Sequence, residues 1–552
     1  MSVPARALPA LLVPLVLLAC GGPKADLAVF GRVWTGDSAR PWAQAVAVRG
    51  DTLVAVGDSA EIARLVGGGT TRLDASGGVV VPGFIDDHVH LFTGGFQLAS
   101  VDLKDADTPA ELVRRLRAHA ATLRPGEWIT GGDWDHERWP GTPLPDRRWI
   151  DSVTPANPVF VSRYDGHMAL ANSLALRAAG LDRSSPAIPG GEMLRRRDAE
   201  LTGVLKDEAM GPVFDAIPAP TEAQLDSALA RALRHAASLG VTGMSSMVTS
   251  WPEIAALARA RERGALTTRV SSYLPLGSWR STAESLKTRG PGDDWLRAAG
   301  VKGFVDGSLG STTALFDDPY LDAPGTRGLF TTPEDSLRVW IGGADSAGLH
   351  VVVHAIGDRA NGLLLDIFDS VATAHGPRDR RFRIEHAQHL RANDITRFAR
   401  LGVIPSMQPY HAVDDGRWAA KRIGPRIRTT YAFRSLLDAN ARLTFGSDWT
   451  VAPLDPMQGI LAGVTRQTLD GRNPEGWVPE EKIRVEEALR AYTASNAFAV
   501  FAEQRRGMLR PGYLADFVVL DRDIFRIPPA EIGAARVRAT VIGGRLVYGA
   551  EP

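Results

Sequence analysis

Residues 79–90 form the stretch Val79-Val80-Val81-Pro82-Gly83-Phe84-Ile85-Asp86-Asp87-His88-Val89-His90. An apolar, β-branched run of this kind is typical of a buried strand, and this one ends in polar side chains. Alternate residues of a strand point to one face, so we expect the His88 and His90 imidazoles to point the same way. Neutral imidazole is a common ligand of divalent transition metals. Alone, the pair fits either a metal site or two solvated histidines.

Seven further strand candidates follow along the chain, with helical spacing between most of them, as in 222–239 and 394–401. This alternation is typical of parallel βα units, and eight units fit a closed, TIM-like (β/α)8 barrel, an α/β fold. The eight strands are expected to end near His90, Met247, Leu276, Gly307, His354, His386, Gln408 and Asp448. The active site of such a barrel lies at these carboxyl ends.

Additional units are predicted around the barrel, which occupies residues 84–505. Short β-like runs separated by glycine turns, in 26–83 and again in 506–549, predict a small β-sandwich formed from both termini. Residues 91–235 are too many for a βα loop and contain strand candidates of their own. We therefore expect an inserted subdomain after the first barrel strand.

The first residues have the pattern of a secretory signal peptide over 1–19, with Arg6 before an apolar run that is too short to span a bilayer. Leu17-Leu18-Ala19-Cys20 resembles the bacterial lipobox, in which the cysteine is acylated after cleavage. An ordinary cleaved signal peptide is the alternative. Both interpretations predict an extracytoplasmic protein, and the first predicts a lipoprotein of the outer membrane or periplasm, held to the membrane only by a lipid on Cys20.

The composition excludes several classes of protein. The 552 residues include 63 basic and 63 acidic side chains, so there is no cationic surplus to bind nucleic acid. A single cysteine excludes a disulfide framework, a zinc ribbon and an iron–sulfur cluster. An enzyme acting on a small molecule remains, and its oligomeric state is left open.

More potential metal ligands end other predicted strands, namely His354, His386 and Asp448. Each one alone would be a polar residue that ends a strand, but together with His88 and His90 they place four imidazoles and a carboxylate on one rim of the barrel. Such convergence is hard to obtain from structural needs alone, and it favours a metal site.

Lys302 lies inside another strand candidate, Gly300-Val301-Lys302-Gly303-Phe304-Val305-Asp306-Gly307. A lysine that points into a barrel is desolvated, which lowers its pKa and frees a nucleophilic amine. Such an amine can add carbon dioxide and become a carbamate, an anionic ligand able to bridge two cations. The alternative is an edge lysine that extends to solvent.

Taken together, these motifs resemble the amidohydrolase superfamily, in particular the branch that includes N-substituted formamide deformylase. The resemblance extends in order over residues 26–549. It rests on the stretches 82–90, 165–173, 301–308, 354–358, 383–388, 446–448 and 512–520. The chain departs from the pattern at Ser245-Ser246, where the family tends to have His-Asp, and at Thr312, where arginine is common. Both departures are expected near the substrate.

The resemblance implies a metal-dependent hydrolase. The implied ligands are His88, His90 and Asp448 for one metal ion, His354 and His386 for a second, and N6-carboxylated Lys302 bridging both. Two zinc ions are expected, with manganese or iron as alternatives. Asp448 is the implied catalytic residue, which would accept a proton from the attacking water and deliver it to the departing amine.

The expected substrate contacts are His167, Trp134, Tyr164, Gln388 and Gln408. A turn signal, Asp165-Gly166, would present His167, whereas the aromatic residues could equally be core. The expected reaction is cleavage of a carbon–nitrogen bond other than a peptide bond, in an amide, N-formyl compound, carbamate or cyclic imide. The alternatives are hydrolysis of esters, lactones or phosphotriesters at the same metal centre, or a binding lipoprotein without catalysis.

Overall fold

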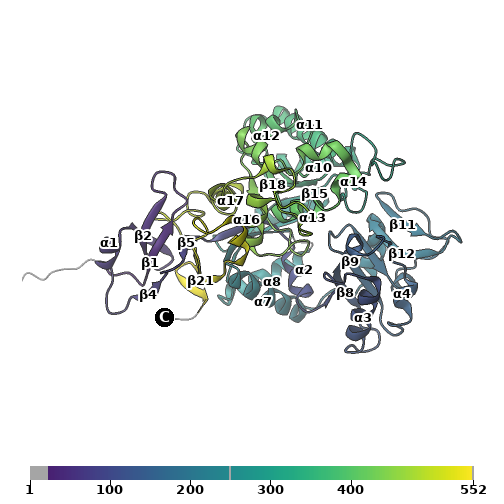
Figure 1. The fold of residues 1–552 in the computed structure, drawn as a ribbon, viewed down its shortest axis with the longest axis horizontal. Coiled ribbons are helices and arrows are strands. Elements are labelled where there is room, and N and C mark those ends of the chain that lie inside the picture. Colours follow the sequence, from purple (N-terminus) through teal and green to yellow (C-terminus); the bar gives the residue numbers. More distant parts are fainter. Residues whose placement is uncertain (1–22, 248–249, 550–552) are drawn as a thin grey trace, which may run out of the picture.

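The computed structural model describes residues 23–247 and 250–549, arranged around three sheets (Figure 1). The expected signal peptide and Cys20 lie outside these residues, so the extracytoplasmic location and the lipid anchor stay predictions. Within the two described ranges, no helix combines the length and the apolar character that crossing a membrane requires.

The central sheet contains eight parallel strands in the same order as in the sequence. They are β6 (Phe84–Val89), β13 (Val241–Met247), β14 (Arg269–Pro275), β15 (Leu296–Phe304), β16 (His350–Ala355), β17 (Arg383–His386), β18 (Ile404–Met407) and β19 (Thr444–Phe445). The last strand returns to the first, because the Asp448 amide donates to the His88 carbonyl at 2.7 Å and the His90 amide to the Trp449 carbonyl at 2.7 Å. The sheet is therefore a nearly closed barrel, as predicted.

Helices surround this sheet. They include α7 (Glu222–Ser238), α8 (Trp251–Glu262), α9 (Trp279–Arg289), α10 (Glu334–Ser346), α11 (Asp358–His375), α12 (Ile395–Leu401), α13 (Pro409–Asp415), α14 (Ala419–Ile423), α15 (Phe433–Asp438), α16 (Pro456–Thr465), α17 (Val485–Ala491) and α18 (Ala494–Ala499). Helix α7 shows why they form: a capping box at Thr221 and Gln224 starts it, and its apolar residues recur at helical spacing. That apolar face packs against Val241 and Met244 of β13.

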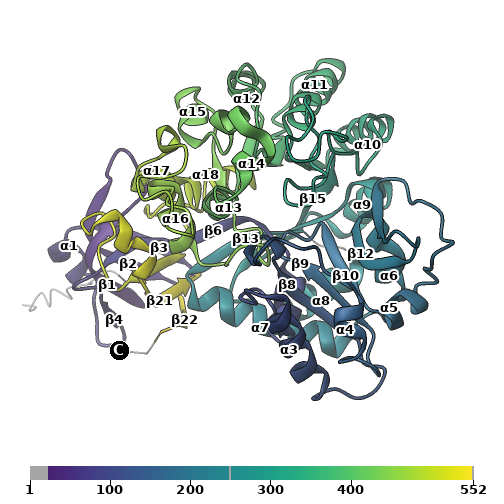
Figure 2. The same ribbon diagram turned by 45° about the vertical axis from the view of Figure 1, so that its right-hand side comes forward.

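Strands from both ends of the chain join in one connected eight-stranded sheet, on the left in Figure 2. The N-terminal part supplies β1 (Leu27–Trp34), β2 (Trp42–Arg49), β3 (Thr52–Gly57), β4 (Thr71–Asp74) and β5 (Val79–Pro82), and a short helix α1 (Ser59–Ala63). The C-terminal part supplies β20 (Phe517–Leu520), β21 (Val537–Ile542) and β22 (Arg545–Tyr548). Antiparallel pairing of β5 with β20 joins the two ends of the chain. The sandwich layering stays a prediction.

A third sheet belongs to the segment between the first two barrel strands and lies beside the barrel, at the lower right in Figure 2. Its strands are β7 (Val101–Asp102), β8 (Ile129–Trp134), β9 (Val159–Arg163), β10 (Met168–Ala171), β11 (Gly191–Arg195) and β12 (Leu201–Asp207). The helices α2 (Leu91–Gln97), α3 (Pro109–Ala120), α4 (Arg148–Asp151), α5 (Ser173–Ala178) and α6 (Gly211–Ala216) accompany it. This sheet has apolar clusters of its own, centred on Trp134 and Phe160.

Candidate metal centre

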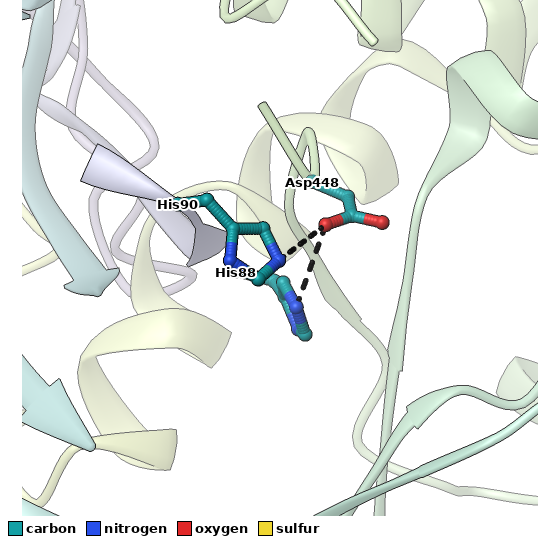
Figure 3. A group of neighbouring side chains, drawn as sticks. All are labelled: His88, His90 and Asp448. Carbon is teal, nitrogen blue, oxygen red and sulfur yellow. Dashed lines mark ion pairs between the residues drawn. The ribbon is translucent and has the colours of Figure 1, made fainter. Parts of the chain in front are cut away.

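Three side chains converge at the carboxyl end of the barrel strands: His88, His90 and Asp448 (Figure 3). The Nε2 atoms of His88 and His90 lie 3.5 and 3.2 Å from Asp448 Oδ1. Asp448 Oδ1 is buried and, among the described residues, has no hydrogen bond of good geometry. Two imidazoles around an orphaned carboxylate oxygen fit a divalent cation such as zinc.

Local backbone contacts hold this group together. The Asp86 carboxylate accepts hydrogen bonds from the His88 amide at 3.1 Å and from the Ser447 amide at 2.9 Å, which ties the first strand to the last. Residue 446 must be glycine, because a Cβ there would lie 2.6 Å from the His88 backbone nitrogen. Asp448 itself adopts a left-handed backbone with φ of 56°, a conformation that non-glycine residues adopt at a cost.

The other predicted histidine ligands lie beside this group. The ring centroid of His386 lies 5.0 Å from that of His88 and 4.5 Å from that of His354. A further histidine, His411 on α13, was not predicted, although potential ligand atoms of His386, His411 and Asp448 all lie within 4.8 Å of one another. The structure therefore offers His411 as well as His354 near a second cation position.

Lys302 points into the same space. Its Nζ lies 3.4 Å from His88 Nε2, and the residue is 5% exposed, so it does not extend to solvent. Burial lowers the pKa of Lys302 to about 8. A neutral amine is therefore accessible near neutral pH, which is the form that can react with carbon dioxide.

Partners behind the ligands orient the imidazoles. His88 Nδ1 donates to Glu385 Oε2 at 2.6 Å, and His386 Nδ1 donates to Gln408 Oε1 at 2.8 Å. Each of these bonds leaves the Nε2 atom of its ring as a lone-pair donor for a metal ion. Burial raises the pKa of Glu385, but the charge of Arg383 and the hydrogen bond from His88 outweigh this effect and hold that pKa well below its usual range.

The three buried imidazoles of His88, His354 and His386 are kept neutral. Burial, helped by the charge of Lys302, lowers the pKa of His88 to about 4. Burial likewise lowers the pKa values of His354 and His386, the latter well below its ordinary value. Since metal coordination requires the neutral ring, these histidines are in the ligating form at neutral pH.

A pocket that is partly open to solvent lies over the metal centre. It is lined by Tyr164, Asp165, His167, Ser308, Leu309, Gly310, His354, Ile356, His386, Gln388, His411, Asp414, Asp415, Asp448 and Val451. Three of the five predicted substrate contacts, Tyr164, His167 and Gln388, are among the lining residues. The barrel and the segment that carries the third sheet thus share the pocket.

The other two predicted contacts lie elsewhere. The Trp134 indole is fully buried in an apolar cluster of the third sheet, and its Nε1 donates to the Val161 carbonyl at 2.8 Å. Gln408 is also fully buried and contacts His386, so the structure gives it an orienting position behind a ligand. Both are structural neighbours of the site rather than lining residues.

His167 reaches the pocket from the segment of the third sheet, just before β10. Its Nδ1 donates to Asp207 Oδ1 at 2.6 Å, and its ring centroid lies 5.1 Å from that of His354. Burial lowers the pKa of His167, but the hydrogen bond and the charge of Asp207 outweigh this effect and raise it overall. Asp207 therefore orients the imidazole toward the metal centre and favours its protonated form.

The two departures from the superfamily pattern, Ser245-Ser246 and Thr312, are not among the residues that line the described pocket, and their expected place near the substrate stays a prediction. Ser245 Oγ donates to Asp87 Oδ1 at 3.1 Å beneath the metal centre. Thr312 Oγ1 accepts a hydrogen bond from Arg422 at 2.7 Å. Both side chains support neighbouring ion pairs instead, since Arg422 also pairs with Glu137 at 2.7 Å and Asp87 with Arg383.

Comparison with known proteins identifies the family of this site. A family model described as "Amidohydrolase family" matches residues 72–548. The chain belongs to the amidohydrolase family. It is 38% identical over 541 residues to "Protein LONG AFTER FAR-RED 3" of Arabidopsis thaliana, covering 96% of this chain and 92% of the relative. It is 27% identical over 537 residues to "N-substituted formamide deformylase" of Arthrobacter pascens, covering 94% and 97%.

A solved structure resembles this amidohydrolase over most of its length. The crystal structure of an uncharacterized metal-dependent hydrolase from Pyrococcus horikoshii matches with a TM-score of 0.74 and 29% identity, covering 91% of this chain and 99% of the other. These similarities confirm the superfamily resemblance. They support an amidohydrolase-type, metal-dependent hydrolase with a barrel fold.

Proposed function

We propose that this amidohydrolase cleaves a carbon–nitrogen bond other than a peptide bond, in an amide, N-formyl compound, carbamate or cyclic imide. The observation that carries the proposal is the convergence of His88, His90 and Asp448 beside buried Lys302 at the floor of a pocket. The similarity to a relative named as a formamide deformylase supports the choice of a C–N bond.

The donor set fits two divalent cations, with zinc preferred and manganese or iron as alternatives. His88, His90 and Asp448 would hold one, and His354 and His386 the other, with Lys302 carboxylated between them. The neutral state of the buried imidazoles and the orphaned Asp448 Oδ1 support this assignment. When bound, such cations polarise a carbonyl and make water acidic enough to be deprotonated near neutral pH.

The side chains of this chain then have distinct roles. Asp448 Oδ1, which has no hydrogen bond of good geometry among the described residues, accepts the proton of the attacking water and passes it to the departing nitrogen. His167, oriented by Asp207, faces the substrate from the inserted subdomain and can donate a hydrogen bond to it. Tyr164 and Gln388 line the same space and would contact the substrate.

We also propose that the protein is an extracytoplasmic lipoprotein anchored through Cys20, on the basis of the Leu17-Leu18-Ala19-Cys20 motif. Expression in a bacterial host with labelled palmitate tests this directly. The wild-type chain should carry label in the membrane fraction and Cys20→Ser should not. Equal labelling of the two chains would contradict the proposal.

Metal removal tests the catalytic proposal. Dialysis against a chelator should abolish hydrolysis of a panel of N-formyl amines, amides and cyclic imides, and added zinc should restore it. Parallel assays with esters, lactones and phosphotriesters distinguish the alternative chemistry. Turnover that is indifferent to metal, or confined to esters and phosphotriesters, would contradict the proposal. Metal binding without any turnover would instead favour the binding-protein alternative.

A further inference from the structure

One side of the pocket has more carboxylates than cations to balance them. Four aspartates and two arginines gather there: Asp135, Asp165, Asp414, Asp415, Arg163 and Arg417. Asp165, Asp414 and Asp415 line the pocket directly. The group joins the inserted subdomain to α13, so it is formed only when the two parts of the chain meet.

The two guanidinium groups are already shared among three of the carboxylates. Arg163 lies 2.6 Å from Asp165 and 3.1 Å from Asp135. Arg417 lies 3.1 Å from Asp135 and also pairs with Asp414. Each arginine thus bridges two aspartates, and no positive charge of this network is left over for a further carboxylate.

Asp415 is the carboxylate without a cation. Among the described residues its side chain accepts one hydrogen bond, from the Tyr431 hydroxyl at 2.6 Å, and forms no ion pair. It is 7% exposed, and that exposed part belongs to the pocket lining. Burial, helped by the charge of Asp414, raises the pKa of the Asp415 carboxyl to about 7, although the hydrogen bond from Tyr431 and the charges of Arg163 and Arg417 oppose this effect. A ligand that brings a positive charge into contact with this carboxyl would stabilise its ionised form, which is costly to bury without a partner.

His411 fixes the place of Asp415 relative to the candidate metal centre, because His411 itself lies beside the second cation position. It is 7% exposed and lines the same pocket, and its Nε2 has no hydrogen-bond partner among the described residues. His411 and Asp415 are four residues apart on α13, so they lie on one face of the helix, separated by a turn of about 5.4 Å. Since His411 lies beside Asp448, Asp415 lies about one helical turn from the reacting centre.

We propose that Asp415 is a subsite for a cationic group of the substrate, such as a protonated primary amine a few carbon atoms from the bond that is cleaved. The inference rests on the proposed C–N hydrolysis and adds a substrate class to it. The substrate would supply the counter-charge that this wall of the pocket lacks.

Two formamides of similar length test the proposal: N-(aminobutyl)formamide, which is cationic at neutral pH, and neutral N-pentylformamide. For the zinc-loaded, full-length wild type, kcat/KM should be at least about tenfold higher for the cationic compound than for the neutral one. A factor of about ten corresponds to the free energy of one charge-assisted hydrogen bond. Asp415→Asn keeps an oxygen that can accept the hydrogen bond from Tyr431. It should remove this preference and leave kcat/KM for N-pentylformamide within about twofold of the wild-type value. Asp198→Asn, at an exposed position of the inserted subdomain, is the matched control and should behave as wild type.

Equal kcat/KM for the two compounds in the wild type would overturn the proposal without any variant. A preference that persists in Asp415→Asn, or an equal loss for both compounds, would overturn it as well. If neither formamide is cleaved, calorimetry with butylammonium and butanol separates the subsite from the reaction. Tighter binding of butylammonium that is lost in Asp415→Asn would support the subsite alone, and equal binding by both proteins would refute it.

Discussion

Replacement of Glu385 by Gln should weaken metal binding without removing a ligand. The Glu385 carboxylate accepts hydrogen bonds from His88 Nδ1 at 2.6 Å, Ser406 Oγ at 2.8 Å and Arg383 Nε at 2.7 Å. The charge of Arg383 and the hydrogen bond from His88 hold its pKa well below the usual range despite burial, so the wild-type carboxylate is ionised at neutral pH. The amide keeps the shape of the side chain and removes the negative charge that supports the His88 ring.

Two magnitudes follow from these contacts. Loss of a carboxylate behind a metal-ligating histidine lowers metal affinity by about 10–100-fold, which corresponds to about 1.4–2.7 kcal/mol. Breaking a buried ion pair costs about 3–5 kcal/mol of unfolding free energy. Arg383 keeps Asp87 as a partner, so we expect a stability loss below that range. Binding and stability should therefore change by separate, measurable amounts.

Zinc affinity should be measured by competition with a chromophoric chelator, and stability by urea unfolding of the metal-free protein. Ser406→Ala is the matched control, because it removes a neutral hydrogen bond to the same Glu385 oxygen and leaves the charge. We expect the control to change zinc affinity by less than about threefold. A folded Glu385→Gln protein with wild-type zinc affinity would refute the argument that this carboxylate orients His88.

Three further predictions concern the reaction and the acid stability of the fold. Asp448→Asn should lower kcat by about 10²–10⁴-fold with an unchanged circular dichroism spectrum, and a loss below tenfold would contradict its role in proton transfer. Lys302→Ala should lose activity and regain part of it with added acetate, whereas failure of every short carboxylate to restore turnover would argue against a carboxylated lysine. Burial lowers the pKa of His389 to about 3, so below pH 6.5 the unfolded chain binds a proton that the folded chain does not. The free energy of unfolding should therefore fall by about 1.4 kcal/mol per pH unit as pH drops below 6.5. Urea unfolding of His389→Gln should lack this part of the slope, and an unchanged slope would contradict the assignment.

The barrel could be predicted because its strands carry two signals at once. Each strand is a short apolar run. Several of these runs end in polar residues that a strand does not need for its stability, such as His88, His386 and Asp448. The positions of the strand ends were confirmed by the eight parallel strands. Parallel strands place their carboxyl ends on one rim, so the convergence of these ligands followed from their place in the sequence.

The parts that sequence reasoning missed depend on contacts between distant segments. His411 lies on a helix, three residues after the strand end predicted at Gln408, and the helix turn directs it into the pocket. The pairing of Arg417 with Asp135 joins residues 282 positions apart, and no local pattern indicates it. Trp134 was predicted to contact substrate because pockets and cores use the same aromatic side chains, and only packing distinguishes the two.

The most direct test of the metal centre is anomalous diffraction from crystals of the purified protein, combined with elemental analysis of the same preparation. We expect a strong anomalous peak within coordination distance of His88, His90 and Asp448, and density extending beyond the Lys302 amine. A protein that contains no stoichiometric transition metal after loading, or a peak that lies away from these three side chains, would contradict it.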